Sequence, residues 1–161
     1  MPQDNKSVIR RFYEEVINQG NVDVLGDIYM PDVEVNTTAI PEPDYPQYGF
    51  ERMKPTFAKL HKAFPGLHAI IDDLVEEKDR VAARVRYHGH LPGQANAATG
   101  RQLLWTGVDV FRMYRGKISE HFGSQDNIEL LEEAGVVQPK EQDASIGRPN
   151  RFSLFSETSS K

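Results

Sequence analysis

The sequence lacks cysteine, has no long hydrophobic run and carries no excess of positive charge. Without cysteine, the chain cannot form disulfides, zinc–thiolate sites, iron–sulfur clusters or a cysteine nucleophile. No segment approaches the roughly 18 apolar residues of a membrane span, and the N-terminus lacks the apolar core of a signal peptide. A formal net charge of −5 provides no basic face for nucleic acid or an anionic membrane. These absences predict a cytoplasmic protein with neither nucleic acid nor membrane as a partner.

The composition is that of a globular protein with one core. Of the 161 residues, 39% are hydrophobic and 27% are charged, which is typical of a single folded domain. From Gln138 onward the chain is rich in Pro, Lys, Gln, Ser and Thr. We therefore expect a domain over residues 1–137 and a polar tail over residues 138–161. The tail contains one apolar patch that could dock on the domain or on a partner, formed by Phe152, Leu154 and Phe155.

Hydrophobic periodicity predicts two helices at the start of the chain. Apolar residues recur at helical spacing over residues 4–19, where Asp4 can cap the helix and Gly20 can end it. A second, short helix has a buried stripe that ends at Tyr29, and it stops near Pro31.

The next segment predicts a strand, a loop and a third helix. Residues 33–38 alternate as a strand does, and residues 40–49 hold three prolines and one glycine, which is typical of a loop. The third helix spans about residues 50–64 and either kinks or begins at Pro55.

After residue 66 the period changes from helical to two, which predicts an antiparallel sheet. A tight turn places Gly116 where a positive φ is needed, and a short helix over residues 126–135 closes the domain. Because the helices precede the sheet, the fold class is α+β: a half-barrel of curved, mainly antiparallel sheet wrapped around three N-terminal helices. Its concave face is the natural ligand site. The four predicted strands are residues 67–77, 80–91, 101–114 and 117–125.

Three stretches carry a resemblance to a known family. They are NKSVIRRFYEEVINQGNVDVLGDIYMPDVEVN, KAFPGLHAIIDDLVEEKDRVAARV and TGRQLLWTGVDVFRMYRGKISEHFGSQD. The third contains TGR, then G-x-D-x-x-R, then GKI-x-EH and finally Asp126. In order and spacing, these motifs resemble the SnoaL-like polyketide cyclases over about residues 5–136.

The resemblance implies a fold and an activity. The fold would be the cone-shaped α+β barrel of the nuclear-transport-factor-2-like superfamily, often a homodimer through the outer sheet face. Cyclases of this family use no cofactor, close rings by intramolecular aldol chemistry and carry an acid/base aspartate at the position that Asp126 matches. Relatives on the fold include epoxide hydrolases, isomerases and non-enzymatic binders, so the fold does not fix the reaction. The chain departs from the family at YHGHLPG and at Asn36, two places expected to touch ligand, so the substrate does not carry over.

Asp126 and His121 are the first candidate catalytic residues. A carboxylate in an apolar cavity has its pKa raised by desolvation, which suits general acid/base catalysis. The alternative is that Asp126 and Glu129 form a capping-box-like pattern at a helix start. His121 would orient Asp126 or bind a substrate carbonyl. An unbroken strand puts the two on opposite faces, so both reach the cavity only if a bulge or the helix turn intervenes.

Asp109 is the third candidate, because an acidic residue in the middle of an apolar strand is costly unless it is paired or used. Arg84 or Arg86 could pair with it. The set Asp109, Arg84 and Asp126 would also suit water activation for epoxide opening.

A further set of residues is predicted to contact a hydrophobic small-molecule substrate. His88 and His90 share a strand face and could hold a metal with His121, but no other ligand spacing supports this, and we expect neither metal nor cofactor. The sequence thus predicts a cofactor-independent cyclase or isomerase, with an epoxide hydrolase or a non-catalytic binding protein as alternatives. The expected substrate-binding residues are Tyr13, Asn36, Arg84, His88, His90, Trp105 and Phe122.

Overall fold

The computed structural model describes residues 4–37, 49–91 and 102–133. The polar tail predicted over residues 138–161, with Phe152, Leu154 and Phe155, lies outside the described residues, as does most of the proline-rich loop.

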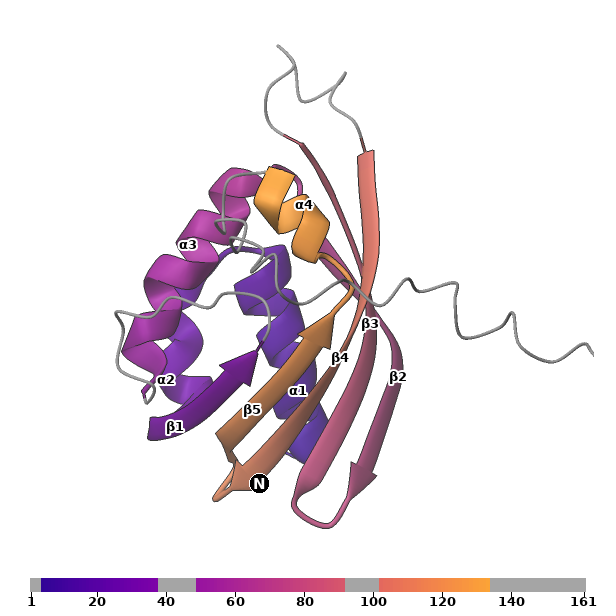
Figure 1. Ribbon diagram of the computed structural model, residues 1–161. Coiled ribbons are helices and arrows are strands. Elements are labelled where there is room, and N and C mark those ends of the chain that lie inside the picture. The colour runs from indigo at the N-terminus through magenta and orange to yellow at the C-terminus, as the bar shows by residue number, and fades with distance from the viewer. Residues whose placement is uncertain (1–3, 38–48, 92–101, 134–161) are drawn as a thin grey trace, which may run out of the picture.

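The described chain contains seven helical segments: four precede β1, two lie between β1 and β2, and one follows β5. Figure 1 labels the four α-helices among them. None of the described helices is long and apolar enough to cross a membrane. The segments are α1 (Asn5–Arg11), the π-helix η1 (Phe12–Asn18), the 3-10 helix η2 (Val22–Val24), α2 (Leu25–Ile28), the 3-10 helix η3 (Phe50–Arg52), α3 (Met53–Ala63) and α4 (Ile128–Glu133).

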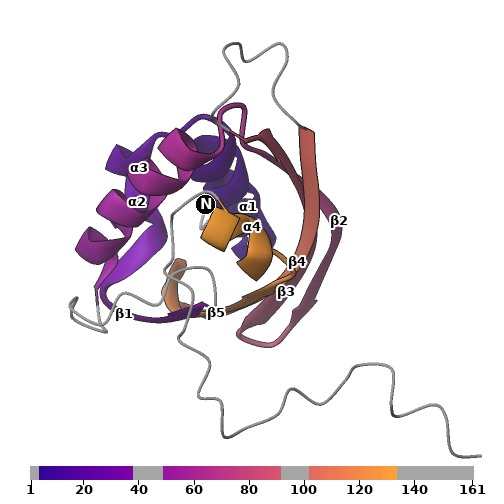
Figure 2. The ribbon, with the colours of Figure 1, turned by 45° about the horizontal axis from the view of Figure 1, so that its top comes forward.

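Five strands form one open sheet in the order β1-β5-β4-β3-β2. Every neighbouring pair is antiparallel except β1 and β5, which run parallel. The sheet curves around α1 and α3, which lie on its concave side (Figure 2). This arrangement confirms the α+β half-barrel predicted from the sequence. The strands are β1 (Tyr29–Thr37), β2 (His68–Glu77), β3 (Arg80–His90), β4 (Gln102–Tyr114) and β5 (Lys117–Gln125).

Strand alternation separates the two faces of the sheet as period two requires. Along β4, Trp105, Gly107, Asp109 and Phe111 are buried on the concave face, while the residues between them are more exposed. The turn between β4 and β5 places Gly116 at a φ of 77°, which confirms the predicted hairpin. The concave face therefore supplies one wall of the core, and the helices supply the other.

The first helix begins as predicted but does not stay α-helical. Asp4 caps it by accepting a hydrogen bond from the Ser7 backbone N–H at 2.9 Å. From Phe12 onward it widens into a π-helix, in which the Gln19 N–H reaches the Glu14 carbonyl five residues back. The wider turn buries four side chains on one face within seven residues, namely Phe12, Tyr13, Val16 and Ile17.

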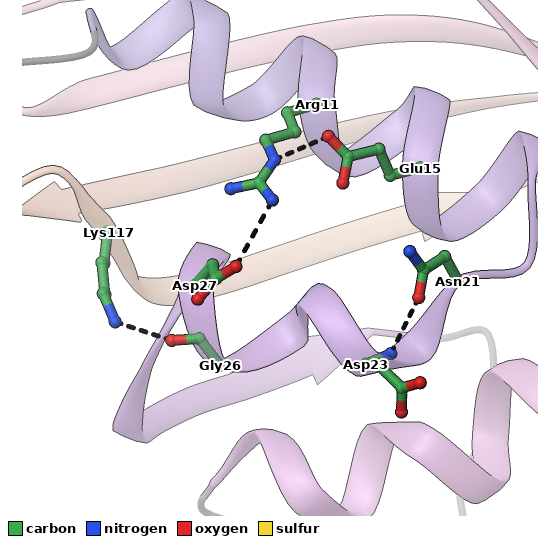
Figure 3. A network of polar contacts seen from close by, with 7 residues as sticks. All are labelled: Arg11, Glu15, Asn21, Asp23, Gly26, Asp27 and Lys117. Carbon is green, nitrogen blue, oxygen red and sulfur yellow. Dashed lines mark hydrogen bonds and ion pairs between the residues drawn. The ribbon is translucent and has the colours of Figure 1, made fainter.

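Polar contacts tie the short helices to the ends of α1 and β5 (Figure 3). The Arg11 guanidinium bonds Glu15 at 2.6 Å and lies 3.4 Å from the Asp27 carboxylate. Lys117, at the start of β5, donates to the Gly26 carbonyl at 2.6 Å. Because α2 is only four residues long, these contacts fix where β1 begins. The strand begins at Tyr29, so the prediction that Tyr29 ends a helix was wrong.

His61 connects α3 to η1. Its Nδ1 lies 2.7 Å from the Phe57 carbonyl oxygen, and its Nε2 lies 2.7 Å from the Ile17 carbonyl oxygen. Both neighbours are acceptors, so both contacts become donations only when the ring carries two protons.

We predict that His61→Leu lowers the free energy of unfolding by about 1–2 kcal/mol, because the Ile17 carbonyl near the end of η1 loses its imidazole partner. Urea unfolding followed by circular dichroism measures the change. Lys62→Leu is the matched control, since Lys62 is exposed in the same helical turn. An equal loss in the two variants would show that the bridge does not stabilise the fold.

Candidate active site

A buried carboxylate, Asp109 on β4, is the centre of the polar interior. Its side chain is 2% exposed. Its Oδ1 lies 3.0 Å from His121 Nε2, and its Oδ2 accepts a hydrogen bond from the Tyr13 hydroxyl at 2.6 Å. The Tyr87 hydroxyl donates more weakly to the same oxygen at 3.4 Å. A buried charge costs free energy unless it is paired, and these donors supply the pairing.

His121 extends the cluster toward β1. The Tyr29 hydroxyl lies 2.9 Å from His121 Nδ1. When Tyr29 donates to Nδ1, the imidazole proton lies on Nε2 and is donated to Asp109. The result is a continuous chain of hydrogen bonds from Tyr29 through His121 and Asp109 to Tyr13.

Aromatic rings surround this chain and exclude water from it. The Phe111 ring centroid lies 4.4 Å from that of His121, and the Phe12 ring meets the same imidazole edge-on at 5.6 Å. In such a low-dielectric interior, hydrogen bonds to a charged group are stronger than in water. The surroundings therefore shield the hydrogen bonds of the cluster from solvent.

The three tyrosines of the cluster are held in their neutral form. Burial raises the pKa of Tyr13, Tyr29 and Tyr87 well above the ordinary phenol value, and the Asp109 charge adds to the effect. A neutral phenol keeps its proton and remains a hydrogen-bond donor at neutral pH.

A second polar group closes the interior on the side of α4. Trp105 Nε1 donates to the Gln125 side-chain oxygen at 3.2 Å, and Asn127 Nδ2 donates to the same oxygen at 3.1 Å. The Trp105 ring stacks on Tyr87, with centroids 5.5 Å apart and planes 9° apart. Asn127 accepts the first α4 hydrogen bond from the Leu131 N–H. This group thus links the end of β5 to the aromatic wall beside Asp109.

Asp126 lies apart from the buried cluster. Its side chain is exposed, and it lines a groove of about 480 Å³ together with outward-facing residues such as Arg84, Thr106 and Ser124. Asn127, rather than Asp126, is the residue before α4 whose carbonyl accepts the first hydrogen bond of the helix. The carboxyl group is therefore outside an apolar cavity, on the face opposite His121, as uninterrupted alternation requires.

The arginines of β3 also point outward. Arg84 Nε bonds Asp73 at 2.7 Å, and Arg86 Nη2 bonds Asp72 at 2.8 Å. Neither ion pair involves Asp109, so the expected Arg–Asp109 pair does not form. The structure does not bring Asp109, Arg84 and Asp126 together.

The remaining predicted contact residues fall into two groups. Tyr13 and Trp105 are in the interior, whereas Asn36 and Phe122 are exposed. The other two predicted residues, both histidines, are half-buried near the end of β3.

His88 lies beside His68, with ring centroids 5.1 Å apart, and His90 Nδ1 lies 3.2 Å from the Pro65 carbonyl oxygen. Burial, together with the His68 and His90 charges, lowers the pKa of His88. Within the described ranges, no three His, Asp or Glu side chains are placed to hold a metal ion.

Four residues of the interior polar groups were not predicted as site residues: Tyr29, Tyr87, Gln125 and Asn127. Tyr87 carried a usable signal, since it is a polar aromatic residue at an inward position of β3. Tyr29 gave none, because its apolar neighbours have helical spacing.

A curved, mainly antiparallel sheet that wraps around N-terminal helices is the fold of nuclear-transport-factor-2-like α+β proteins. The family model for SnoaL-like polyketide cyclases matches residues 7–134, and the chain belongs to that family. No curated protein sequence matches the chain.

Solved structures give the same fold. IdmH from Streptomyces antibioticus, a proposed polyketide cyclase, has a TM-score of 0.68 and 25% identity, covering 83% of this chain and 99% of IdmH. AclR from Streptomyces galilaeus, a proposed hydroxylase, has a TM-score of 0.63 and 21% identity, covering 86% and 85%. TsrD from Streptomyces laurentii has a TM-score of 0.63 and 23% identity, covering 82% and 95%. Since the last two are under 25% identical, they show the fold alone.

We predict that the three buried tyrosines ionise only when the protein unfolds. Below the ordinary phenol pKa of about 10, both states keep their protons. Above it, the unfolded state loses protons that the folded state retains, so stability falls as pH rises. Absorbance at 295 nm should therefore increase in two steps, the later one coinciding with loss of near-ultraviolet circular dichroism.

One variant assigns the late step of this titration. Tyr29→Phe removes one of the three buried phenols and should reduce only that step. Ionisation of all six tyrosines near pH 10 in a protein that keeps its native dichroism would contradict the prediction.

Proposed function

We propose that this protein is a cofactor-independent cyclase or isomerase that works by acid/base catalysis on a polyketide-like or terpenoid-like intermediate. The observation that carries the proposal is the 3.0 Å contact between Asp109 and His121 inside an aromatic core. Membership of the SnoaL-like family supports the same reaction type. We assign the acid/base role to the Asp109–His121 pair.

The proposed reaction needs no external reagent. Asp109 removes an acidic proton from a carbon between two carbonyl groups, and the enolate carbon attacks a second carbonyl carbon of the same molecule. One carbon–carbon bond forms, one carbonyl π bond breaks, and the proton on Asp109 passes to the new alkoxide. Atoms and electrons balance without a cofactor. Because a protonated Asp109 is a weaker acceptor, the Tyr13 phenol can then donate to the enolate oxygen, which stabilises its charge.

The substrate would reach the pair from the side of α4. Gly123 lies directly across from Asp109 on β5, and Gly107 is the next inward residue along β4. Neither has a side chain to fill the space beside the carboxylate. Gln125 and the Tyr87 ring lie next to Gly107, so the Gln125 side chain would have to move when a substrate binds.

The water-adding alternative receives less support. Epoxide opening by Asp109, Arg84 and Asp126 would need the three on one face of the sheet, and Arg84 and Asp126 line the outer groove. A non-catalytic binding protein is distinguished by experiment, as described below.

We predict that Asp109→Asn lowers kcat for ring closure of a cyclisable poly-β-carbonyl compound by about 10²–10⁴-fold, the typical contribution of a general acid/base group. Product formation is followed by absorbance. Asp126→Asn is the comparison variant, since Asp126 is exposed, and its kcat should change less than about twofold. The reverse pattern would assign the acid/base role to Asp126, as the sequence resemblance implied.

Binding measured beside turnover separates the enzyme from a binding protein. If poly-β-carbonyl compounds bind the unmodified protein but none is converted, the catalytic proposal fails and the binding alternative is supported.

The homodimer that the resemblance implies stays a prediction. The outer sheet face would form it, because several large apolar side chains are exposed there. They include Ile70, Leu104, Val108 and Phe122.

A further inference from the structure

Two N–H donors converge on one oxygen atom beside the proposed catalytic pair. The Gln125 side-chain oxygen receives Trp105 Nε1–H at 3.2 Å and Asn127 Nδ2–H at 3.1 Å. Both donor residues are buried, at 5% and 4% exposure. Trp105 comes from β4, and Asn127 is the residue just before α4. A fixed pair of donors from separate elements is the arrangement that binds a carbonyl or enolate oxygen.

Gly107 allows Gln125 to reach this position. A Cβ added at Gly107 would lie 2.9 Å from the Gln125 Cγ and 3.2 Å from the Tyr87 ring, so Gln125 lies directly across the interior face of β4. Gly107 is two residues from Asp109, which places Gln125 roughly 7 Å along the strand from the carboxylate. The donor pair therefore belongs to the same interior as Asp109.

We propose that the Gln125 carboxamide occupies the place of a substrate carbonyl, and that Trp105 Nε1–H and Asn127 Nδ2–H form the binding site for that oxygen. When the substrate binds, the Gln125 side chain turns away, and a substrate carbonyl oxygen replaces the Gln125 oxygen as the acceptor of both hydrogen bonds. The two buried donors thus stay paired in the free and the bound states, which avoids the cost of an unsatisfied buried N–H. The inference rests on the proposed function in that the ligand is a polycarbonyl compound.

The geometry also limits the shape of the ligand. One oxygen would bind at the donor pair while the reacting carbons lie at Asp109, so the molecule must span roughly 7 Å or more. The wall between the two points is the flat stack of Trp105 on Tyr87. A flat wall favours a planar, conjugated and polyoxygenated ligand, such as an enolised poly-β-carbonyl chain.

The chain has one tryptophan, so the indole N–H of Trp105 gives a single nitrogen–proton NMR resonance that reports directly on the site. The probe is emodin, a planar hydroxylated anthraquinone with carbonyl groups. Emodin should shift this resonance in the unmodified protein. Gln125→Ala should bind emodin about tenfold more tightly, because the internal competitor and its modest hydrogen bonds are gone. Ser124→Ala, an outward neighbour, should stay within about twofold of the unmodified protein.

A second variant tests the donor itself. In the Gln125→Ala background, Trp105→Phe removes the N–H but keeps an aromatic ring against Tyr87, and emodin affinity should fall about tenfold. The visible absorbance of emodin provides the readout, and thermal unfolding checks that each variant is folded. The proposal is overturned if emodin fails to bind Gln125→Ala, if bound emodin leaves the indole resonance unmoved, or if the phenylalanine variant binds equally well.

The outcome is separable from that of the proposed function. Asp109→Asn should bind emodin with the same indole shift although it loses turnover. If emodin shifts the indole and no polycarbonyl compound is ever converted, the donor site stands and the catalytic proposal fails. If a polycarbonyl compound is converted but bound emodin does not shift the indole resonance, the catalytic proposal stands and the donor site fails.

Discussion

A carboxylate placed inside an apolar core is the constraint on which the interior of this protein depends. An uncompensated charge at Asp109 would cost several kcal/mol, so the surrounding elements each contribute a partner. Tyr13 comes from η1, Tyr87 from β3 and His121 from β5, and Tyr29 on β1 holds the far side of the imidazole. The fold therefore brings these partners to Asp109, and without them the buried carboxylate would destabilise the fold.

The same requirement connects stability with chemistry. A hydrogen-bond network that is fully satisfied in an apolar interior adopts one arrangement, because each alternative leaves a polar group unpaired. That arrangement holds a carboxylate, an imidazole and neutral phenols in a fixed order. The Gln125 group next to it follows the same rule, since two buried N–H groups share one acceptor. In both groups, the need to pair buried polar atoms fixes the positions of the side chains that a substrate would contact.

The sequence predicted the features that depend on local periodicity and missed those that depend on distant contacts. The change to period two predicted the strands of the sheet, and the cost of burying a charge drew attention to Asp109. Tyr13 could not be foreseen as a partner of Asp109, because the two residues are 96 positions apart in the sequence. The arginines of β3 were equally reasonable partners as long as the direction of their side chains was unknown. At Asp126 two lines of reasoning conflicted: strand alternation placed it opposite His121, and the resemblance placed it in the cavity. The structure follows the alternation.

The π-helix has a consequence for comparing this chain with its relatives. A π-helix closes each hydrogen bond over five residues, where an α-helix closes it over four, so a π-helical turn behaves as a one-residue insertion. Tyr13 lies in this π-helix, and its hydroxyl meets the carboxylate 2.6 Å away. In a relative with an uninterrupted α-helix here, the aligned tyrosine would point elsewhere, even if its sequence matched. The length of this helix, rather than the identity of one residue, would then distinguish members that keep a phenol at the buried acid from members that do not.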